Sequence, residues 1–392
     1  MRKKVVKTLI GLLIIIIIAI VCVIILNPFA SLEFPEDMPT SNTLLNSAIL
    51  GGNYLINVTW DNGIFLYEYD PVNDIKSDSY NILRHAGTIY SMLELYDITG
   101  DEELLSSAEK AISYLLSFEK PYGNGSGIVY DNAIKLGGNG LAILALAEHA
   151  RITGDMQHLS SMQHLAIYIK ESQNDSGGFL SKRYYSTEQE SDFESLYYPG
   201  EAILSLCRLY ALDKNETWLD VAEKGALYLI NLRSDIPTTD LVHDHWLVIA
   251  LNELYRYRDN QKYFDHSMRL AESIMSTQTD GIIKTTNDPD RIGSYSLPRS
   301  APTATRTEAL IAAFHLANDF GNDLSKTQRI LNAISLGIQF QLRTQFTEDN
   351  MQNVLFPEKA IGGFHDSLTN YNIRIDYVQH NICSILGLYE II

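Results

Sequence analysis

The chain has 392 residues, of which 46% are hydrophobic and 20% are charged, so it has enough apolar material for a large folded domain. Its formal net charge of −18 excludes a general nucleic-acid binder, because phosphates require a basic face and no Lys/Arg cluster occurs outside the N-terminus. The cysteines Cys22, Cys207 and Cys383 all fall in apolar stretches, and they predict neither a disulfide framework nor a cysteine metal site.

The first element in chain order is an uncharged run from Thr8 to Leu26. At about 1.5 Å per residue in a helix, its roughly 19 residues span about 28 Å, enough to cross the hydrocarbon layer of a bilayer. Basic residues precede the run and acidic residues follow it, so the positive-inside rule predicts a cytoplasmic N-terminus. We therefore expect a stub and a single transmembrane anchor over residues 1–31, and an extracytoplasmic domain over residues 32–392. The alternative is a cleaved signal peptide, although no A-x-A cleavage site follows the run.

A helix–turn–helix repeat follows this run. The segment "LYDITGDEELLSSAEKAISYLLSF" (95–118) is echoed by "HARITGDMQHLSSMQHLAIYIKES" (149–172) and by "LYALDKNETWLDVAEKGALYLINL" (209–232), with weaker copies at 254–277 and 316–339. The spacing of about 45 to 65 residues exceeds the roughly 34 residues of a tetratricopeptide repeat. Each copy has apolar residues at i, i+3, i+4 and i+7 around a polar turn, which predicts a hairpin of two helices.

The two helices of each hairpin differ in composition. The first is rich in small apolar residues and is predicted to be an inner helix, whereas the second carries a charged face. Glycine-containing stretches such as "GSGIVYDN", which join each outer helix to the next inner one, predict short turns or hairpins. Inner helices are predicted at 82–98, 138–153, 199–212, 244–258, 304–319 and 375–390. Outer helices are predicted at 42–57, 101–118, 156–173, 215–232, 261–277 and 324–342.

Six inner and six outer helices in this order resemble the (α/α)6 toroids of the six-hairpin glycosidase-like superfamily, over about residues 40–392. The resemblance implies an all-α toroid of helical hairpins, here preceded by a transmembrane helix, and a carbohydrate-active enzyme. The segment "QNDSGGF" (173–179) is also similar to the Q-x3-G-x-W element of terpenoid cyclases, with Phe179 in place of the tryptophan. A terpenoid cyclase or prenyltransferase is the weaker interpretation, because the chain has no D-x-D-D or D-D-x-x-D motif and no Cys-Asp-His zinc set.

The beginnings of the predicted inner helices carry polar and aromatic residues. Parallel inner helices open on one end of a toroid, so these residues are expected to wall one cavity. Capping explains Asp and Glu at helix starts, and Asp244 or Glu308 taken alone fits that role, but capping does not require Arg, His, Trp or paired Tyr. The predicted site residues are Arg84, His85, Asn139, Tyr197, Tyr198, Glu201, Asp244, His245, Trp246, Arg306, Glu308, Arg374, Asp376, Tyr377 and His380.

Cations near a helix N-terminus are unfavourable, so Arg84, Arg306 and Arg374 need partners, either carboxylates of the cavity or an anionic ligand. A glycan substrate fits the whole set best, because the 23 tyrosines offer amphipathic faces for sugar rings. Glycosidic cleavage requires one protonated and one ionised carboxyl group. The candidate catalytic residues are Glu201, Asp376, Asp244 and Glu308, with Glu201 and Asp376 as the expected pair. The other predicted site residues are expected to bind the substrate.

Other functions use the same cavity. A histidine pair such as His245 and His380, or a carboxylate with Tyr377, would serve a uronate epimerase or a polysaccharide lyase. A non-catalytic toroid that binds glycan or peptide needs no such set. "HDHW" (243–246) suggests part of a metal site, but H-x-H at a helix start is a poor chelate, so we expect neither a metal nor another cofactor. The expected partners are a carbohydrate and, through the N-terminal segment, the membrane.

Overall fold

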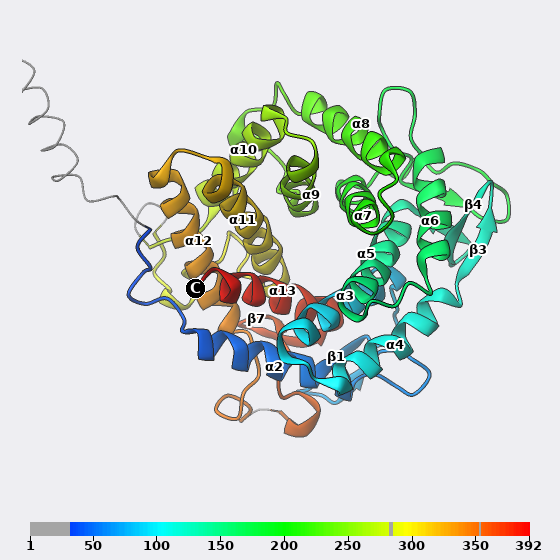
Figure 1. The fold of residues 1–392 in the computed structure, drawn as a ribbon. Coiled ribbons are helices and arrows are strands. Elements are labelled where there is room, and N and C mark those ends of the chain that lie inside the picture. The colour runs from blue at the N-terminus through cyan, green and yellow to red at the C-terminus, as the bar shows by residue number, and fades with distance from the viewer. Residues whose placement is uncertain (1–31, 282–284, 353) are drawn as a thin grey trace, which may run out of the picture.

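The computed structural model describes residues 32–281, 285–352 and 354–392, and the twelve α-helices in these ranges form a ring of six hairpins (Figure 1). The predicted transmembrane segment lies outside the described residues. Among the helices within them, none combines the length and the apolar character that a membrane span requires.

Six inner helices surround the centre of the ring. Each contacts the next in chain order and the last contacts the first, so the ring is closed and the predicted (α/α)6 toroid is confirmed. Inner helices are apolar on nearly every side because they pack between two neighbours and an outer helix; the second one is buried continuously from Leu136 to Ala150. The inner helices are α3 (Ile82–Thr99), α5 (Leu136–Thr153), α7 (Tyr198–Asp213), α9 (His245–Tyr257), α11 (Ser300–Phe320) and α13 (Ile375–Ile391).

Six outer helices form the second layer, and their ranges agree with the prediction to within a few residues. Their polar starts have a local cause: Asp101, Asn215 and Asn260 each cap a helix by accepting a hydrogen bond from a backbone N–H of its first turn. The outer helices are α2 (Ser41–Asn57), α4 (Glu102–Leu116), α6 (Leu159–Glu171), α8 (Glu216–Leu232), α10 (Gln261–Thr277) and α12 (Leu324–Leu342).

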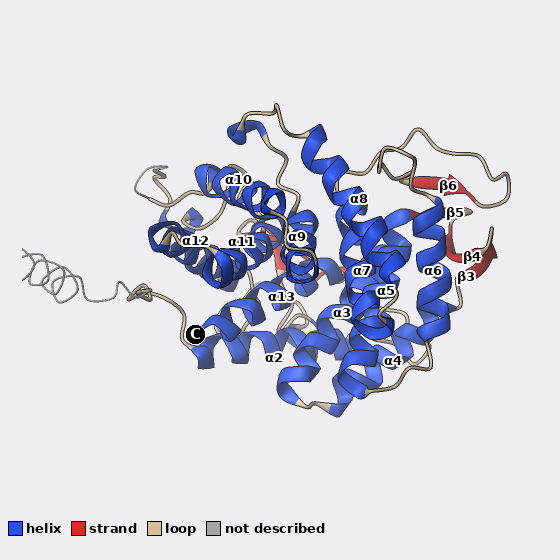
Figure 2. Cartoon of the chain, turned by 45° about the horizontal axis from the view of Figure 1, so that its top comes forward, coloured by secondary structure: helices blue, strands red, loops and turns tan. Residues whose placement is uncertain are grey.

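Short strands occupy the connections, and the structure assembles them into two four-stranded sheets that the sequence does not predict. The first has the order β2-β1-β8-β7 and the second the order β3-β4-β5-β6, which lies outside α6 (Figure 2). In the first sheet Glu68 pairs with Arg374, so the first and last connections are joined directly before α13. The strands are β1 (Glu68–Asp70), β2 (Ile75–Lys76), β3 (Glu119–Tyr122), β4 (Gly125–Tyr130), β5 (Ala133–Lys135), β6 (Lys182–Tyr184), β7 (His365–Ser367) and β8 (Asn370–Arg374).

The Q-x3-G element has a structural role between outer helices. The side-chain amide of Gln173 donates to the carbonyl oxygens of Gly177 (3.3 Å) and Val221 (3.0 Å), the latter in α8. Gly177 has a φ of +103°, a conformation that only glycine adopts easily. Equivalent amide bonds reach the next outer helix from Gln278 and Gln345. The element therefore ties neighbouring hairpins together, which explains the likeness without a cyclase function.

The largest difference from the predicted boundaries is at α11, which begins at Ser300 and not at residue 304. Pro302 lies in its first turn, where a proline is tolerated because the missing N–H has no partner within the helix. Arg306 and Glu308 consequently lie in the second and third turns of the helix. Glu308 is thus placed deeper in the ring than a residue at a helix entrance would be.

Candidate active site

A cavity of about 880 Å³ opens at the end of the ring where the inner helices begin, and every inner helix contributes lining residues. Its size accommodates a sugar of more than one ring. The predicted site residues that line it are Arg84, Tyr197, Tyr198, Glu201, His245, Trp246, Arg306, Arg374, Asp376, Tyr377 and His380.

Two predicted site residues are held in the walls of the toroid and do not line this cavity. His85 is fully buried, and its Nε2 lies 2.9 Å from the carbonyl oxygen of Ala111 in the neighbouring outer helix. The Asn139 side chain accepts from the backbone N–H of Ile128 (2.9 Å) and donates to the carbonyl oxygen of Ser126 (3.1 Å). Both side chains satisfy backbone groups between elements, which is the usual role of a buried polar residue.

Asp244 also lies outside the cavity lining. It is fully buried, its Oδ2 is 3.0 Å from Arg233 Nη2, and its Oδ1 caps α9 by accepting from the backbone N–H of Leu247 at 3.1 Å. Burial raises the pKa of Asp244 to about 6, although the Arg233 guanidinium opposes this shift. The carboxylate is therefore fully engaged in fixing the start of α9, which carries His245.

Glu308 lies on the floor between two cavities. It lines a second cavity of about 420 Å³, which opens where the inner helices end. Trp246 and Gln379 line both cavities and therefore separate them. The Glu308 carboxylate contacts two histidines that line the larger cavity, so it supports that site from below.

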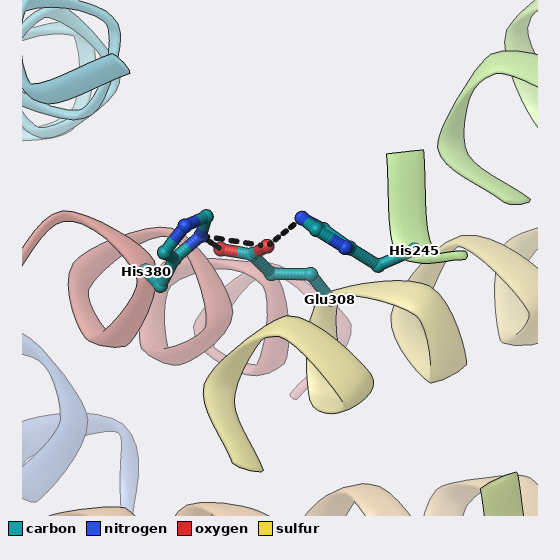
Figure 3. A group of neighbouring side chains, drawn as sticks. All are labelled: His245, Glu308 and His380. Atoms are coloured by element: carbon teal, nitrogen blue, oxygen red, sulfur yellow. Dashed lines mark hydrogen bonds and ion pairs between the residues drawn. The ribbon is translucent and has the colours of Figure 1, made fainter. Parts of the chain in front are cut away.

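His245, Glu308 and His380 form one cluster, contributed by α9, α11 and α13 (Figure 3). His380 Nδ1 lies 3.2 Å from both carboxylate oxygens of Glu308, and His245 Nε2 lies 3.9 Å from Oε2. The two imidazole rings are 5.5 Å apart between centroids and nearly perpendicular. His245 Nε2 is buried and has no hydrogen-bond partner among the described residues.

The environments of the two histidines push their pKa values apart. Burial lowers the pKa of His380, but the adjacent Glu308 carboxylate outweighs this effect and raises it above the ordinary value. Burial, together with the nearby His380 and Arg306, holds the pKa of His245 well below the ordinary value. The raised pKa favours the protonated form of His380, paired with Glu308, whereas the lowered pKa keeps His245 neutral. One acid and one base of this kind suit proton transfer.

The same three side chains could hold a metal ion, because one ligand atom from each lies within 4.8 Å of the others. The metal site that "HDHW" suggests is not assembled, because His243 Nδ1 accepts a hydrogen bond from Arg306 Nε at 2.8 Å. Its Nε2 lies 3.2 Å from Ser273 Oγ, so both ring nitrogens of His243 are occupied.

Glu201 stands in the first turn of α7, together with Pro199, and its carboxyl group faces the N-terminal turn of α5. The residue is 5% exposed and its Oε2 has no hydrogen-bond partner among the described residues. Burial, and secondly the charge of Asp244, raise the pKa of Glu201 to about 8. Glu201 is therefore a protonated acid at neutral pH.

Replacing Glu201 by Gln is expected to stabilise the protein progressively as the pH rises. Between an unfolded pKa of about 4.5 and the folded pKa of about 8, the unfolded chain loses a proton that the native protein keeps, so the wild type loses stability with rising pH. Glu201→Gln lacks this penalty, which is on the order of a few kcal/mol at pH 8. Urea unfolding of both proteins at several pH values between 4.5 and 8 measures the difference, and a pH-independent difference would contradict the raised pKa.

Gly137 permits the close approach of Glu201 to α5. A Cβ atom at position 137 would lie 2.0 Å from Glu201 Oε2 and 2.5 Å from Tyr198 Cδ1. We expect Gly137→Ala to displace both side chains and to lower the free energy of unfolding by about 1–3 kcal/mol. Gly138→Ala is the matched control, because its Cβ meets nothing nearer than Leu83 Cδ1 at 3.6 Å. Equal unfolding midpoints in urea for the two variants would contradict this packing.

Asp376 is held by two arginines at the rim of the cavity. Its Oδ2 is 3.0 Å from Arg84 Nε, and its Oδ1 is 2.6 Å from Arg374 Nε. Arg84 also donates to the hydroxyl of Tyr67. Arg84 and Arg374 therefore share a carboxylate partner, as is expected for cations near helix N-termini.

Five polar lining residues are not among the predicted site residues, namely Asn81, His243, Arg299, Thr305 and Gln379. The predicted helix begins at residue 304, so Arg299, which directly precedes the observed start of α11 at Ser300, is expected to lie in a loop. His243 and Thr305 lie at inner-helix starts and are marked by position alone. Gln379 lies between Tyr377 and His380, two predicted site residues of the same helix, and this position was the available signal.

A search against protein-family models finds no match, and a search of curated protein sequences finds none either. Solved structures that are similar to this chain include enzymes that act on sugars. The cellobiose 2-epimerase of Bacillus thermoamylovorans B4167 is 12% identical with a TM-score of 0.69, over 90% of this chain and 99% of that one. A D-mannose isomerase is 13% identical with a TM-score of 0.68, over 92% and 100%.

The α-1,6-mannanase of Salegentibacter sp. HEL1_6 is 14% identical with a TM-score of 0.63, over 88% of this chain and 98% of that one. At these identities the likeness shows the fold alone. The chain has an (α/α)6 toroid fold, and solved structures of similar fold include both epimerases and a hydrolase.

Proposed function

We propose that this protein is a carbohydrate epimerase or isomerase that moves a proton next to a sugar carbonyl group. The observation that carries the proposal is the pair of histidines, His245 and His380, whose rings lie edge to face with centroids 5.5 Å apart in a sugar-sized cavity. Their pKa values are shifted in opposite directions, and Glu308 lies against both. The fold that the chain shares with sugar epimerases and isomerases is consistent with this chemistry.

The reaction follows from the two protonation states. Neutral His245 removes the proton from the carbon beside the carbonyl group of an open-chain sugar, and the electron pair of the broken C–H bond forms an enediolate. Protonated His380 then returns a proton to the opposite face of the same carbon, which inverts its configuration. Glu308 stabilises whichever of the two histidines is protonated, because its carboxylate lies near both rings.

Incubation of the purified full chain with reducing sugars tests this function. The proposal predicts new epimers or ketoses on chromatography, with no increase in the number of reducing ends. It also predicts full activity after dialysis against EDTA. An increase in reducing ends would indicate hydrolysis, an unsaturated uronate would indicate a lyase, and loss of activity with the chelator would indicate a metal site; each result contradicts the proposal.

Hydrolysis of a glycoside is the second candidate, favoured by Glu201. A general acid in a glycosidase requires a protonated carboxyl group together with an ionised one. Glu201, whose Oε2 has no partner among the described residues, lines the same cavity as the paired carboxylate of Asp376. Glu201→Gln should abolish the release of reducing ends in a hydrolase. In an epimerase the two histidines remain, so epimer formation should persist.

We also propose that the protein is anchored in a membrane by residues 8–26, with the toroid outside the cytoplasm. Support comes from the uncharged run and from the basic residues before it. Protease protection of the full chain in sealed vesicles tests the orientation. Release of the toroid without its N-terminal segment would indicate a cleaved signal peptide.

A further inference from the structure

Arg306 differs from the other arginines of the cavity because it has no carboxylate partner among the described residues. Four arginines line the cavity. Arg84 and Arg374 share Asp376, and Arg299 Nη2 lies 2.7 Å from Asp366 Oδ1. Among the residues that the structure describes, none with a carboxylate forms an ion pair with Arg306.

The Arg306 side chain is nevertheless fixed. Its Nε donates to His243 Nδ1 at 2.8 Å, its Nη1 donates to the carbonyl oxygen of Pro302 at 2.7 Å, and its guanidinium carbon lies 4.5 Å from the centre of the Tyr295 ring. These partners are all neutral. Holding His243 in place requires only a neutral donor, so they do not explain why this position carries a positive charge.

The cavity as a whole has an excess of positive charge, in a protein whose net charge is −18. Four guanidinium groups face it, and the carboxyl groups in its lining are those of Glu201, which is protonated, and Asp376, which two arginines share. A desolvated cation without a counter-ion is costly, so the arrangement is stabilised when an anion enters.

We infer that the substrate is an anionic sugar, a uronate or a sugar phosphate, whose negative group binds Arg306. This inference names the substrate class of the proposed epimerase or isomerase. That the anionic sugar is converted rests on the proposed function, whereas its binding to Arg306 does not. A charge-assisted hydrogen bond to a guanidinium is expected to strengthen binding about 10- to 100-fold over the neutral sugar.

Calorimetric titration of the full chain in detergent, at low ionic strength, tests the inference. The ligands are glucuronate, galacturonate and mannuronate, the matching hexose 6-phosphates, and the three neutral hexoses. We expect at least one anionic sugar to bind about tenfold or more tightly than its neutral counterpart. A preference for the uronates or for the phosphates identifies the group. Equal affinities, or no binding of any anionic sugar at millimolar concentration, would overturn the inference.

Two variants assign the effect to Arg306. Arg306→Gln should lose the preference for the anion and keep the affinity for the neutral hexose, whereas Arg306→Lys should retain most of the preference because it keeps the charge. A preference that survives in Arg306→Gln would overturn the assignment. Binding and turnover are measured in separate assays, so the two proposals can fail separately. Binding of an anionic sugar without epimerisation would contradict only the proposed function. Epimerisation of neutral sugars without binding of an anionic sugar would contradict only the inference.

Discussion

Replacing either His245 or His380 by Gln is expected to lower kcat by about 10²- to 10⁴-fold, which is the usual contribution of a general acid or base. Substrate affinity should change only a few-fold, because Arg84, Arg306 and Arg374 remain in the cavity. Steady-state kinetics of the two variants, with product identified by chromatography, measures this effect. His164→Gln is the matched control, because His164 is exposed on α6 and should leave kcat unchanged.

The pH profile distinguishes proton transfer from a merely structural role for these histidines. In the direction in which His245 is the base, activity should fall as the pH rises through the raised pKa of His380, because the acid is lost. The acidic limb should lie well below pH 6.5, where His245 finally becomes protonated. Glu308→Gln removes the carboxylate that raises the pKa of His380, so it should move the alkaline limb to lower pH. An unmoved limb would contradict the assigned roles.

Asp244→Ala is expected to destabilise the protein by about 3–5 kcal/mol, because it leaves the buried Arg233 guanidinium without a counter-ion. The Asp244 side chain is fully buried and that of Arg233 is 9% exposed, so solvent cannot replace the lost partner. The variant also loses the N-cap of α9, which contributes about 1 kcal/mol of this effect. Urea unfolding monitored by circular dichroism measures the change.

Asp61→Ala is the control for Asp244→Ala, because Asp61 also forms an ion pair, with Lys110 at 3.3 Å, but is fully exposed. Its removal should change the free energy of unfolding by no more than about 1 kcal/mol. Similar decreases in the free energy of unfolding for the two variants would contradict a stabilising role of the Arg233–Asp244 ion pair at the start of α9.

The helices could be predicted from the sequence because their cause is local. Apolar residues at helical spacing and capping residues such as Asp101 and Asn215 mark the helices and the starts of outer helices without reference to the rest of the chain. The sheet that joins β1 to β8 could not be predicted in this way, since its partners lie about 300 residues apart and each strand is only a few residues long. The pairing of β1 with β8 forms only when the first and last hairpins of the toroid come together.

The candidate site could be located from the sequence, but the roles within it could not be assigned. Position at an inner-helix start brought eleven of the fifteen predicted residues to one cavity. The same criterion does not reveal which way a side chain points, so it also selected His85 and Asn139, which bind backbone groups in the walls. It could not reveal the Glu308 contact with His380 either, because those residues lie 72 positions apart in the sequence.

The central claim is that His245 and His380 exchange a proton with the carbon next to a sugar carbonyl group. Turnover in D2O tests it most directly, with the recovered sugar analysed by NMR. The account predicts one deuterium from solvent at the carbon that receives the proton: the same carbon in an epimer, or the former carbonyl carbon in an isomer. The rate of labelling should fall with kcat in both histidine variants. Epimer or isomer formed without solvent deuterium, or labelling that persists in both variants, would contradict it.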